Sequence, residues 1–484
     1  MSSPYPTTGR QEAIDFLMGR LNYERAVTIP YQELTLKLQR MRRLLDLLGN
    51  PQRRLNIVHV AGSKGKGSTV MTIASLLTAA GQDAGTYTSP HLERVEERVS
   101  VNGQPISSDD FIGLVGQIRP AVDELDRADD LVDEFGGPTY FEILTALAML
   151  HFDQQKVRWC VLEVGLGGRL DSTNVCQPLV TVITSISLDH MLQLGNTLGQ
   201  IAREKAGILK PGIPLVNGVA TGQAREVIQR IAQPLGCEIY TLGEEFHVRY
   251  RPAQSRPGEL GPAQLGPAQS GNVSSQGGRF DYRDTAVEFH DLPLRLMGSH
   301  QAENAGIAIK AIRLLQRHGI EIDQHQLKDG LASVNCPARI EIISGQPPIV
   351  LDTAHNVASI KALLEVLESS FGQRRRVFVL ATTRGKAVRE MLRCLSDQVG
   401  VLILTQYVDN PRSHTPQDLA TIVEELRSSG EFGQSMQVHL AENPDMAWQL
   451  ASGTARPEDV LCVTGSFFLA AELLATLRGQ ACVV

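Results

Sequence analysis

The stretch that decides the fold is V-A-G-S-K-G-K-G-S-T, Val60–Thr69. It lies between an apolar, strand-like run at Leu55–Val60 and a segment whose apolar residues recur at helical spacing. Glycines at a strand-to-helix turn let backbone N–H groups point into one concavity, and the helix N-terminus behind them adds partial positive charge. We therefore predict a phosphate-binding loop in which Lys66 reaches the terminal phosphates and Ser68 or Thr69 faces a metal ion.

The loop differs from the commonest phosphate-loop pattern at one position. That pattern places a glycine six residues before the lysine, whereas this chain has Val60 there. A surface turn rich in glycine and lysine is the alternative interpretation. The strand-like run before the stretch and the helical spacing after it favour the phosphate loop, so nucleotide-driven chemistry is the leading hypothesis.

The size and composition are those of an ordinary globular protein. The 484 residues are enough for two or three domains, and 42% of them are hydrophobic. The net charge of −7 argues against a nucleic-acid-binding protein, which is usually basic. Seven cysteines without a C-x-x-C pair argue against a disulfide framework and a structural zinc site. Neither a signal pattern nor a long apolar run occurs, so we expect a soluble, cytoplasmic protein with no membrane partner.

Alternating strand and helix signals continue beyond the loop. A β-rich run at Ala84–Thr88 and an amphipathic stretch at Phe141–Phe152 precede β-rich runs at Arg158–Val164 and Leu179–Ile186. Strand-like runs return late in the chain, at Ile349–Leu351, Val377–Leu380, Val401–Leu404 and Val460–Val463. This alternation is typical of parallel sheets covered by helices. We therefore predict two α/β domains joined near Asn335–Arg339.

One segment of low complexity interrupts this pattern. Residues Arg251–Gly278 repeat Pro-Ala-Gln three times and then turn to serine and glycine. Few apolar residues are present to offset the entropy lost on ordering. We predict a flexible surface insertion without a catalytic role.

Polar residues that can bind a divalent cation follow three of the predicted strands. Ser89 lies in T-S-P-H-L, Glu163 lies near the end of its strand, and His190 follows Leu179–Ile186. Ligands bind at the carboxyl ends of parallel strands, and Mg²⁺ is the expected ion where nucleotide phosphates supply oxygen ligands. Taken singly, Glu163 is as well explained as a core carboxylate, and His190 is better explained as a structural residue. Their common location favours the metal site.

Lys205 stands on the apolar face of a predicted helix at Thr197–Ile208. A lysine in such a place usually extends its ammonium to water, and the spacing by itself favours this interpretation. The alternative is that a metal site matches its charge, or that carbon dioxide converts it to an anionic carbamate.

A further motif, D-T-A-H-N, follows the predicted strand Ile349–Leu351 directly. Its Asp352 and His355 are placed to contact a nucleotide or substrate across a cleft between domains. Alone the signal is weak, because Asp and Asn also cap helices.

A series of motifs extends from about Ile14 to Leu477, interrupted by the Pro-Ala-Gln segment. They are His59–Thr69, Thr88–Leu92, Thr139–Glu142 (T-Y-F-E), Leu162–Asn174 (L-E-V-G-L-G-G-R-L-D-S-T-N), Leu188–His190, Arg203–Ile208 (R-E-K-A-G-I), Pro337–Glu341 (P-A-R-I-E), Asp352–Asn356 and Val463–Ser466. In this order they resemble the folylpolyglutamate synthase/dihydrofolate synthase family, a branch of the Mur-ligase-like ATP-dependent amide ligases. The resemblance implies a P-loop ATPase domain with a parallel sheet, residues 1–336, and a smaller Rossmann-like α/β domain, residues 337–484.

The resemblance also implies a role for each matching residue. ATP would be held by Gly62, Ser63, Lys64, Gly65, Lys66, Gly67, Ser68, Asn304, Arg339 and Asp352. Magnesium ions would be bound by Ser89, Glu163 and His190. Lys205 would be the family's carbamylated lysine, which reverses the expectation from spacing, and His355 would lie near the incoming glutamate. The pteroate or folate side would be formed by Thr139, Tyr140, Phe141, Glu142 and Leu170.

The implied activity is ATP-dependent addition of L-glutamate to dihydropteroate or a reduced folate, by a monomer that uses Mg²⁺. The alternatives are another Mur-type amino-acid ligase and a non-ligase P-loop NTPase, although the latter leaves T-S-P-H-L, R-E-K-A-G-I and D-T-A-H-N without a purpose. Two departures from the family pattern occur. Ser63-Lys64 replaces Thr-Asn and adds a positive charge beside the phosphates. The loop Thr383–Ala387 (T-R-G-K-A) lacks the acids of the usual Asp-Lys-Asp, which puts its role in doubt.

Overall fold

The computed structural model describes residues 9–25, 37–128, 137–253, 277–343 and 345–481. The chain forms two compact units. The first consists of the chain up to Arg249 together with Asp281–Leu292 and Glu303–Asn335, and the second consists of Tyr250–Phe280, Pro293–Ala302 and the chain from Cys336 onward. Among the described residues, no helix is long and apolar enough to cross a bilayer.

The first unit is built on an eight-stranded sheet in the order β4-β3-β2-β5-β1-β6-β7-β8. The strands from β2 to β8 in this order are parallel, and β3 and β4 add an antiparallel edge that the sequence analysis missed. The strands are β1 (Asn56–Ala61), β2 (Ala84–Tyr87), β3 (Val99–Val101), β4 (Gln104–Pro105), β5 (Trp159–Glu163), β6 (Pro178–Ile183), β7 (Leu215–Asn217) and β8 (Ile239–Thr241). The prediction of a parallel α/β sheet is confirmed.

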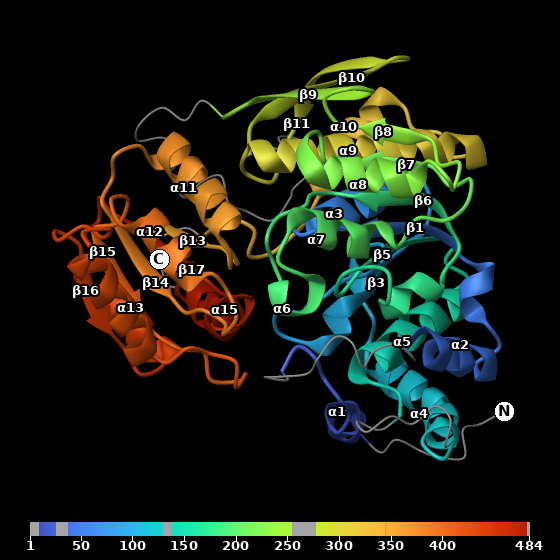
Figure 1. Ribbon diagram of the computed structural model, residues 1–484, viewed down its shortest axis with the longest axis horizontal. Helices are drawn as coiled ribbons and strands as arrows, with labels where there is room; N and C mark the ends of the chain where they lie inside the picture. Colours follow the sequence, from blue (N-terminus) through green and yellow to red (C-terminus); the bar gives the residue numbers. More distant parts are fainter. Residues whose placement is uncertain (1–8, 26–36, 129–136, 254–276, 344, 482–484) are drawn as a thin grey trace. The chain divides into compact units, whose positions relative to one another are not determined.

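Helices cover both faces of this sheet (Figure 1). On one face, Cys160 and Leu162 of β5 pack with α1, α2, α4 and α5, and Ala61 of β1 and Ile183 of β6 pack with α7 and α8. The opposite face is covered by α3, which contacts β1, β2 and β5 and against which α10 packs. The helices are α1 (Arg10–Met18), α2 (Lys37–Leu47), α3 (Lys66–Ala79), α4 (Ser108–Leu125), α5 (Tyr140–Gln154), α6 (Met191–Leu194), α7 (Leu198–Ala206), α8 (Gly222–Ala232), α9 (Ser299–Leu315) and α10 (Gln324–Ser333). The predicted helices at Phe141–Phe152 and Thr197–Ile208 correspond to α5 and α7.

A small three-stranded sheet was not predicted. Its order is β11-β10-β9, formed by Phe246–Arg251 (β9), Arg279–Asp284 (β10) and Glu288–Pro293 (β11). The Pro-Ala-Gln segment connects β9 to its neighbour β10, so Arg251 belongs to a strand and not to the insertion. The predicted flexibility of this segment concerns residues 254–276, which lie outside the described residues.

The second unit contains a six-stranded sheet in the order β12-β13-β17-β14-β15-β16. Only β12 is antiparallel to its neighbour, which gives the expected Rossmann-like character. Its strands are β12 (Glu341–Ile343), β13 (Ile349–Leu351), β14 (Arg376–Leu380), β15 (Val401–Leu404), β16 (Gln437–Leu440) and β17 (Val460–Thr464). Its helices are α11 (Val357–Phe371), α12 (Val388–Leu395), α13 (Pro416–Ser428), α14 (Pro444–Thr454) and α15 (Phe467–Ala481). The four predicted strands are present, whereas β12 and β16 escaped prediction because they are short and only partly buried.

Candidate active site

Two glycines give the loop between β1 and α3 its shape. Gly62 has φ +155°, and a Cβ there would lie 1.9 Å from Thr184 Oγ1. Gly65 has the left-handed φ of +77° and caps α3, and a Cβ there would lie 2.3 Å from Asn304 Oδ1. Both positions therefore require glycine. The close approach also places the buried Asn304 of α9 against the phosphate loop.

Hydroxyl groups that follow β6 hold this loop from behind. The Ser63 N–H donates to the Ser185 carbonyl at 2.7 Å, and the Ser63 hydroxyl donates to the Ser187 carbonyl at 3.0 Å. The Lys64 N–H donates to the Ser185 hydroxyl at 3.1 Å, and the Thr184 hydroxyl donates to the Lys64 carbonyl at 2.5 Å. Thr184, Ser185 and Ser187 were not predicted as part of the site, although the run T-S-I-S at a strand end was a readable signal.

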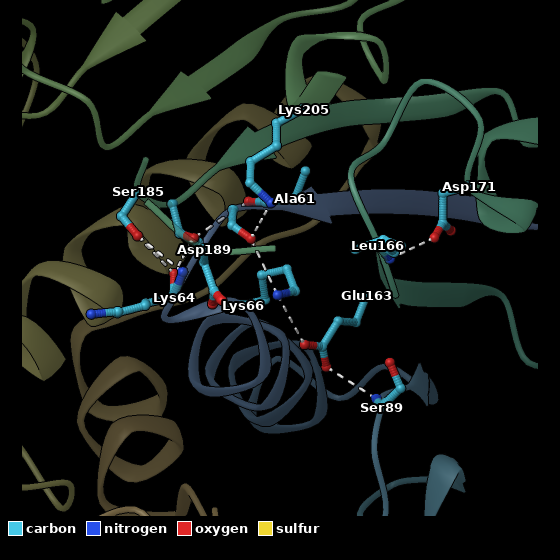
Figure 2. Close-up of polar contacts among 12 residues, drawn as sticks. Ala61, Lys64, Lys66, Ser89, Glu163, Leu166, Asp171, Ser185, Asp189 and Lys205 are labelled. Atoms are coloured by element: carbon cyan, nitrogen blue, oxygen red, sulfur yellow. Dashed lines mark hydrogen bonds and ion pairs between the residues drawn. The ribbon is translucent and has the colours of Figure 1, made fainter. Parts of the chain in front are cut away.

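Three predicted residues meet at the mouth of the loop (Figure 2). Lys66 Nζ donates to the Gly62 carbonyl at 3.1 Å and lies 3.9 Å from Glu163 Oε1. The Ser89 N–H donates to Glu163 Oε2 at 3.3 Å. Glu163 is buried. A buried carboxylate beside a hydroxyl and a phosphate loop presents the oxygen ligands that Mg²⁺ prefers.

His190 occupies a less regular place, at the residue before α6. Its backbone is left-handed, with φ +50°, and its N–H donates to the carboxylate of Asp189 at 2.9 Å. Its Nε2 lies 3.9 Å from the same carboxylate, and its side chain is 37% exposed. In the described part of the chain, no group of three or more His, Cys, Asp and Glu side chains is arranged to hold a metal. A Mg²⁺ site does not need such a group, because Mg²⁺ commonly binds through one or two carboxylates, and phosphate and water oxygens complete its coordination shell.

Lys205 is buried, with 4% of its surface exposed. Its Nζ donates to the Gly62 carbonyl at 2.9 Å. Lys205 of α7 and Lys66 therefore donate to the same carbonyl of the phosphate loop (Figure 2). The expectation from spacing, an ammonium extended into water, is wrong. The reason is that α7 packs against α8 and the sheet, and the loop carbonyl lies at the end of the side chain and accepts its hydrogen bond.

The T-Y-F-E segment forms the start of α5. Thr139 is the N-cap, and Thr139 and Glu142 complete a capping box with each other. The Glu142 carboxylate also accepts from Arg40 Nε at 3.0 Å, and both side chains are buried. Glu142 is thus engaged within the fold. Phe141 is different, because its ring faces Gly165 of the glycine-rich run, where a Cβ would lie 2.5 Å away.

The glycine-rich run is held by Asp171, directly after the half-buried Leu170. The Asp171 carboxylate accepts from the Leu166 N–H at 2.9 Å and from the Thr173 N–H at 3.0 Å. The Thr173 hydroxyl lies 2.8 Å from Nε2 of His59, the β1 residue three positions before Gly62. Burial lowers the pKa of His59 to about 3, so this histidine is neutral.

In the second unit, the predicted residues gather at the end of β13. The buried Asp352 carboxylate accepts from the Ala354 N–H at 2.7 Å and the Ile340 N–H at 3.0 Å, and burial raises its pKa. Arg339 donates to the Thr353 hydroxyl. Nδ1 of His355 lies 2.9 Å from the Thr353 carbonyl, and because a carbonyl only accepts, Nδ1 carries a proton.

The loop T-R-G-K-A, which differs from the family pattern, follows β14 in the same unit. Thr383 accepts from the Tyr407 hydroxyl at 2.8 Å, and the Arg384 N–H donates to the Arg412 carbonyl at 2.7 Å. These contacts tie the loop to the segment after β15. The loop is therefore ordered by polar contacts that do not use the missing acids.

Comparisons with known proteins agree with this geometry. The Mur ligase middle domain matches residues 134–312, and the glutamate ligase domain of Mur ligases matches residues 338–467. The dihydrofolate synthase/folylpolyglutamate synthase of Bacillus subtilis is 33% identical, covering 97% of this chain and 100% of that protein. The folylpolyglutamate synthase of Lacticaseibacillus casei is 33% identical, covering 91% of this chain and 94% of that protein.

Solved structures extend the likeness to three dimensions. Folylpolyglutamate synthase of Mycobacterium tuberculosis complexed with ADP has a TM-score of 0.83 and 29% identity, covering 97% of this chain and 98% of that one. E. coli FolC in complex with DHPP and ADP has a TM-score of 0.77 and 27% identity, covering 99% of each chain. The resemblance drawn from the motifs is thus confirmed, and the chain belongs to the folylpolyglutamate synthase/dihydrofolate synthase family of Mur-type ligases.

Proposed function

We propose that this protein is an ATP-dependent ligase that joins the amino group of L-glutamate to a carboxylate of a pteroate or folate. The observation that carries the proposal is the grouping of Lys66, Glu163 and Ser89 at the N-terminus of α3. This grouping places the Lys66 ammonium and the side-chain oxygens of Glu163 and Ser89 beside the phosphate loop. Relatives of nearly full length that are named for this activity support the same conclusion.

The chemistry proceeds in two steps. A substrate carboxylate oxygen attacks the γ-phosphorus of ATP, the bond to the bridging oxygen breaks, and ADP leaves with an acyl phosphate formed. The neutral amine of glutamate then attacks the acyl carbon, inorganic phosphate leaves with the C–O bond electrons, and the amine loses a proton to solvent. A carboxylate needs this activation because it is a poor electrophile. The enzyme contributes positioning and neutralisation of charge.

The first unit supplies the groups for phosphoryl transfer. Gly62–Ser68 cradle the phosphates with backbone N–H groups, Lys66 neutralises the charge that develops on the γ-phosphoryl group, and Asn304 borders the nucleotide. Ser89 and Glu163 fit Mg²⁺ because both offer hard oxygen ligands, and His190 is the third proposed ligand. When bound, the ion screens the phosphate charges and orients the γ-phosphoryl group.

Lys205 is proposed to act as a carbamate. Lys66 and Lys205 both donate to the Gly62 carbonyl, so two ammonium groups would lie close together beside one acceptor. Reaction of the neutral Lys205 amine with CO₂ forms an N–C bond and releases a proton. The product is an anion that retains one N–H for Gly62, so carbamylation removes the repulsion and keeps the hydrogen bond.

The remaining assignments follow the family pattern. Arg339 and Asp352 contact the nucleotide, and His355 lies near the incoming glutamate. Thr139, Tyr140, Phe141 and Leu170 border the pteroate, and the Phe141 ring lies against Gly165, in the same glycine-rich segment as Leu170. Glu142 is better explained as a structural partner of Arg40.

A substrate panel with purified protein tests the proposal. ADP formation and product mass are measured with ATP, Mg²⁺ and L-glutamate, together with dihydropteroate or a reduced folate. We expect ADP release only when glutamate and one of these acceptors are both present, with a product heavier by one glutamyl residue. ADP release without glutamate would favour a non-ligase NTPase, and activity only with other acceptors would favour another Mur-type ligase.

A further inference from the structure

Arg98 lies where three segments of the first unit meet. It is the last residue of a 3₁₀ turn, Val95–Arg98, directly before β3, and only 1% of its side chain is exposed. Nη1 and Nη2 donate to the two oxygens of Glu24, at 2.8 and 2.6 Å. A paired contact of this kind fixes the plane of the guanidinium as well as its position.

The guanidinium also contacts two segments that the proposed function uses, a loop and the start of a helix. Nε donates to Nδ1 of His91 at 2.8 Å, and His91 stands two residues after Ser89. Cζ lies 5.3 Å from the centre of the Tyr140 ring, a cation–π contact. Tyr140 is the first residue of α5, between Thr139 and Phe141. One buried cation therefore joins the loop that carries Ser89 to the helix start that carries Phe141.

Main-chain hydrogen bonds reinforce the same junction. The Thr88 N–H donates to the Arg98 carbonyl at 2.9 Å, and the Tyr140 N–H donates to the Leu21 carbonyl at 3.0 Å. Leu21 lies three residues before Glu24, the partner of Arg98. In a buried setting, hydrogen bonds of a charged group are stronger than in water, so the contacts of Arg98 restrict the relative movement of both loops.

We propose that Arg98 is a positioning residue for the ligation reaction. It holds the metal-side loop Thr88–Leu92 in one place relative to the start of α5, so that the carboxylate to be phosphorylated meets the γ-phosphate in reactive geometry. This inference rests on the proposed function. Arg98 touches no reacting atom in this scheme, and its effect is exerted through Ser89 and Phe141. A displacement of about 1 Å in such an arrangement costs about 100-fold in rate.

The test compares Arg98→Met with Arg10→Met. Arg10 forms a paired contact with Glu96 of the same 3₁₀ turn, at 2.6 and 2.9 Å, and is the matched control. For Arg98→Met we expect kcat/KM for the pteroate substrate to fall about 10- to 100-fold. The Mg²⁺ concentration for half-maximal rate should rise, while the Kd of ADP changes by less than about twofold, because the phosphate loop is held by other residues. Arg10→Met should keep all three values.

A second variant covers the case in which Arg98→Met does not fold. His91→Ala removes only the contact to the metal-side loop and leaves the Glu24 pair intact, so it should also raise the Mg²⁺ requirement. Wild-type values in either folded variant, or equal losses in Arg98→Met and Arg10→Met, would overturn the inference. Failure of the wild-type protein to form ADP with glutamate and any pteroate would instead overturn the proposed function.

Discussion

The Gly62 carbonyl is the point at which single residues matter most, because Lys66 and Lys205 converge on it. We predict that Lys66→Ala lowers kcat by about 100- to 1,000-fold, the loss typical when one group that stabilises transition-state charge is removed. Lys66 is partly exposed, so melting should change little. Steady-state ADP release and a thermal melt check this, and a folded variant with near-normal turnover would exclude the phosphate-loop assignment.

Substitutions of Lys205 test whether a positive or a negative charge is needed beside the Gly62 carbonyl. If Lys205 acts as a carbamate, Lys205→Ala should impair ligation, and added short carboxylates should restore part of the rate by filling the vacated anionic site. Lys205→Arg should not restore activity, because a guanidinium has the wrong charge. Rates in the presence and absence of acetate measure the effect. An active Lys205→Arg variant would contradict the carbamate and leave a hydrogen-bonding role for an ammonium.

Among the elements, the start of α5 depends on the buried pair of Arg40 and Glu142. We predict that Glu142→Gln lowers the free energy of unfolding by about 3–5 kcal/mol, because it breaks a buried ion pair by removing one of its two charges. The double variant Arg40→Met/Glu142→Leu should recover most of this loss. Denaturant unfolding gives the stabilities, and KM for the pteroate separates the two roles. A stable double variant with a greatly raised KM would show that Glu142 contacts the substrate after all.

The 3₁₀ turn before β3 has a predictable pH dependence. Burial raises the pKa of Glu96, but Arg10 and Arg94 outweigh it, and the pKa falls from 4.5 to about 2. A lowered carboxyl pKa stabilises the fold above pH 4.5, and this contribution is lost as the pH falls toward 2. Arg10→Met should therefore cost about 1–2 kcal/mol at neutral pH, with a shrinking difference from wild type below pH 4.5. A difference that grows on acidification would contradict this assignment.

For the whole molecule, the clearest question is what the Pro-Ala-Gln segment contributes. Arg251 of β9 and Gly278 before β10 are in contact, because a Cβ on Gly278 would lie 2.4 Å from the Arg251 carbonyl. A short Asn-Gly turn can therefore replace residues 254–276. We predict unchanged kcat/KM and a gain of about 1 kcal/mol in stability from the shorter loop. A large loss of turnover in a folded deletion variant would assign the segment a role in catalysis.

The sequence by itself determined the four central strands of each large sheet, the phosphate loop and the family. Continuous apolar runs such as Ile349–Leu351 and Val401–Leu404 identify buried parallel strands because both of their faces are covered. The glycines of the loop are also readable signals, because a positive φ favours glycine whatever the residue later packs against. Short, partly exposed strands such as β12 and β16 carry too little apolar pattern to be recognised.

Only the tertiary structure decided how distant side chains pair. Lys205 is buried because the Gly62 carbonyl, 143 positions away in the chain, accepts its hydrogen bond. Glu142 pairs with Arg40, and Arg98 donates hydrogen bonds to Glu24 and His91. No local sequence pattern encodes these contacts. The physical reason is that helical or strand periodicity reports which face of an element is buried. The partner found on that face depends on how the elements pack.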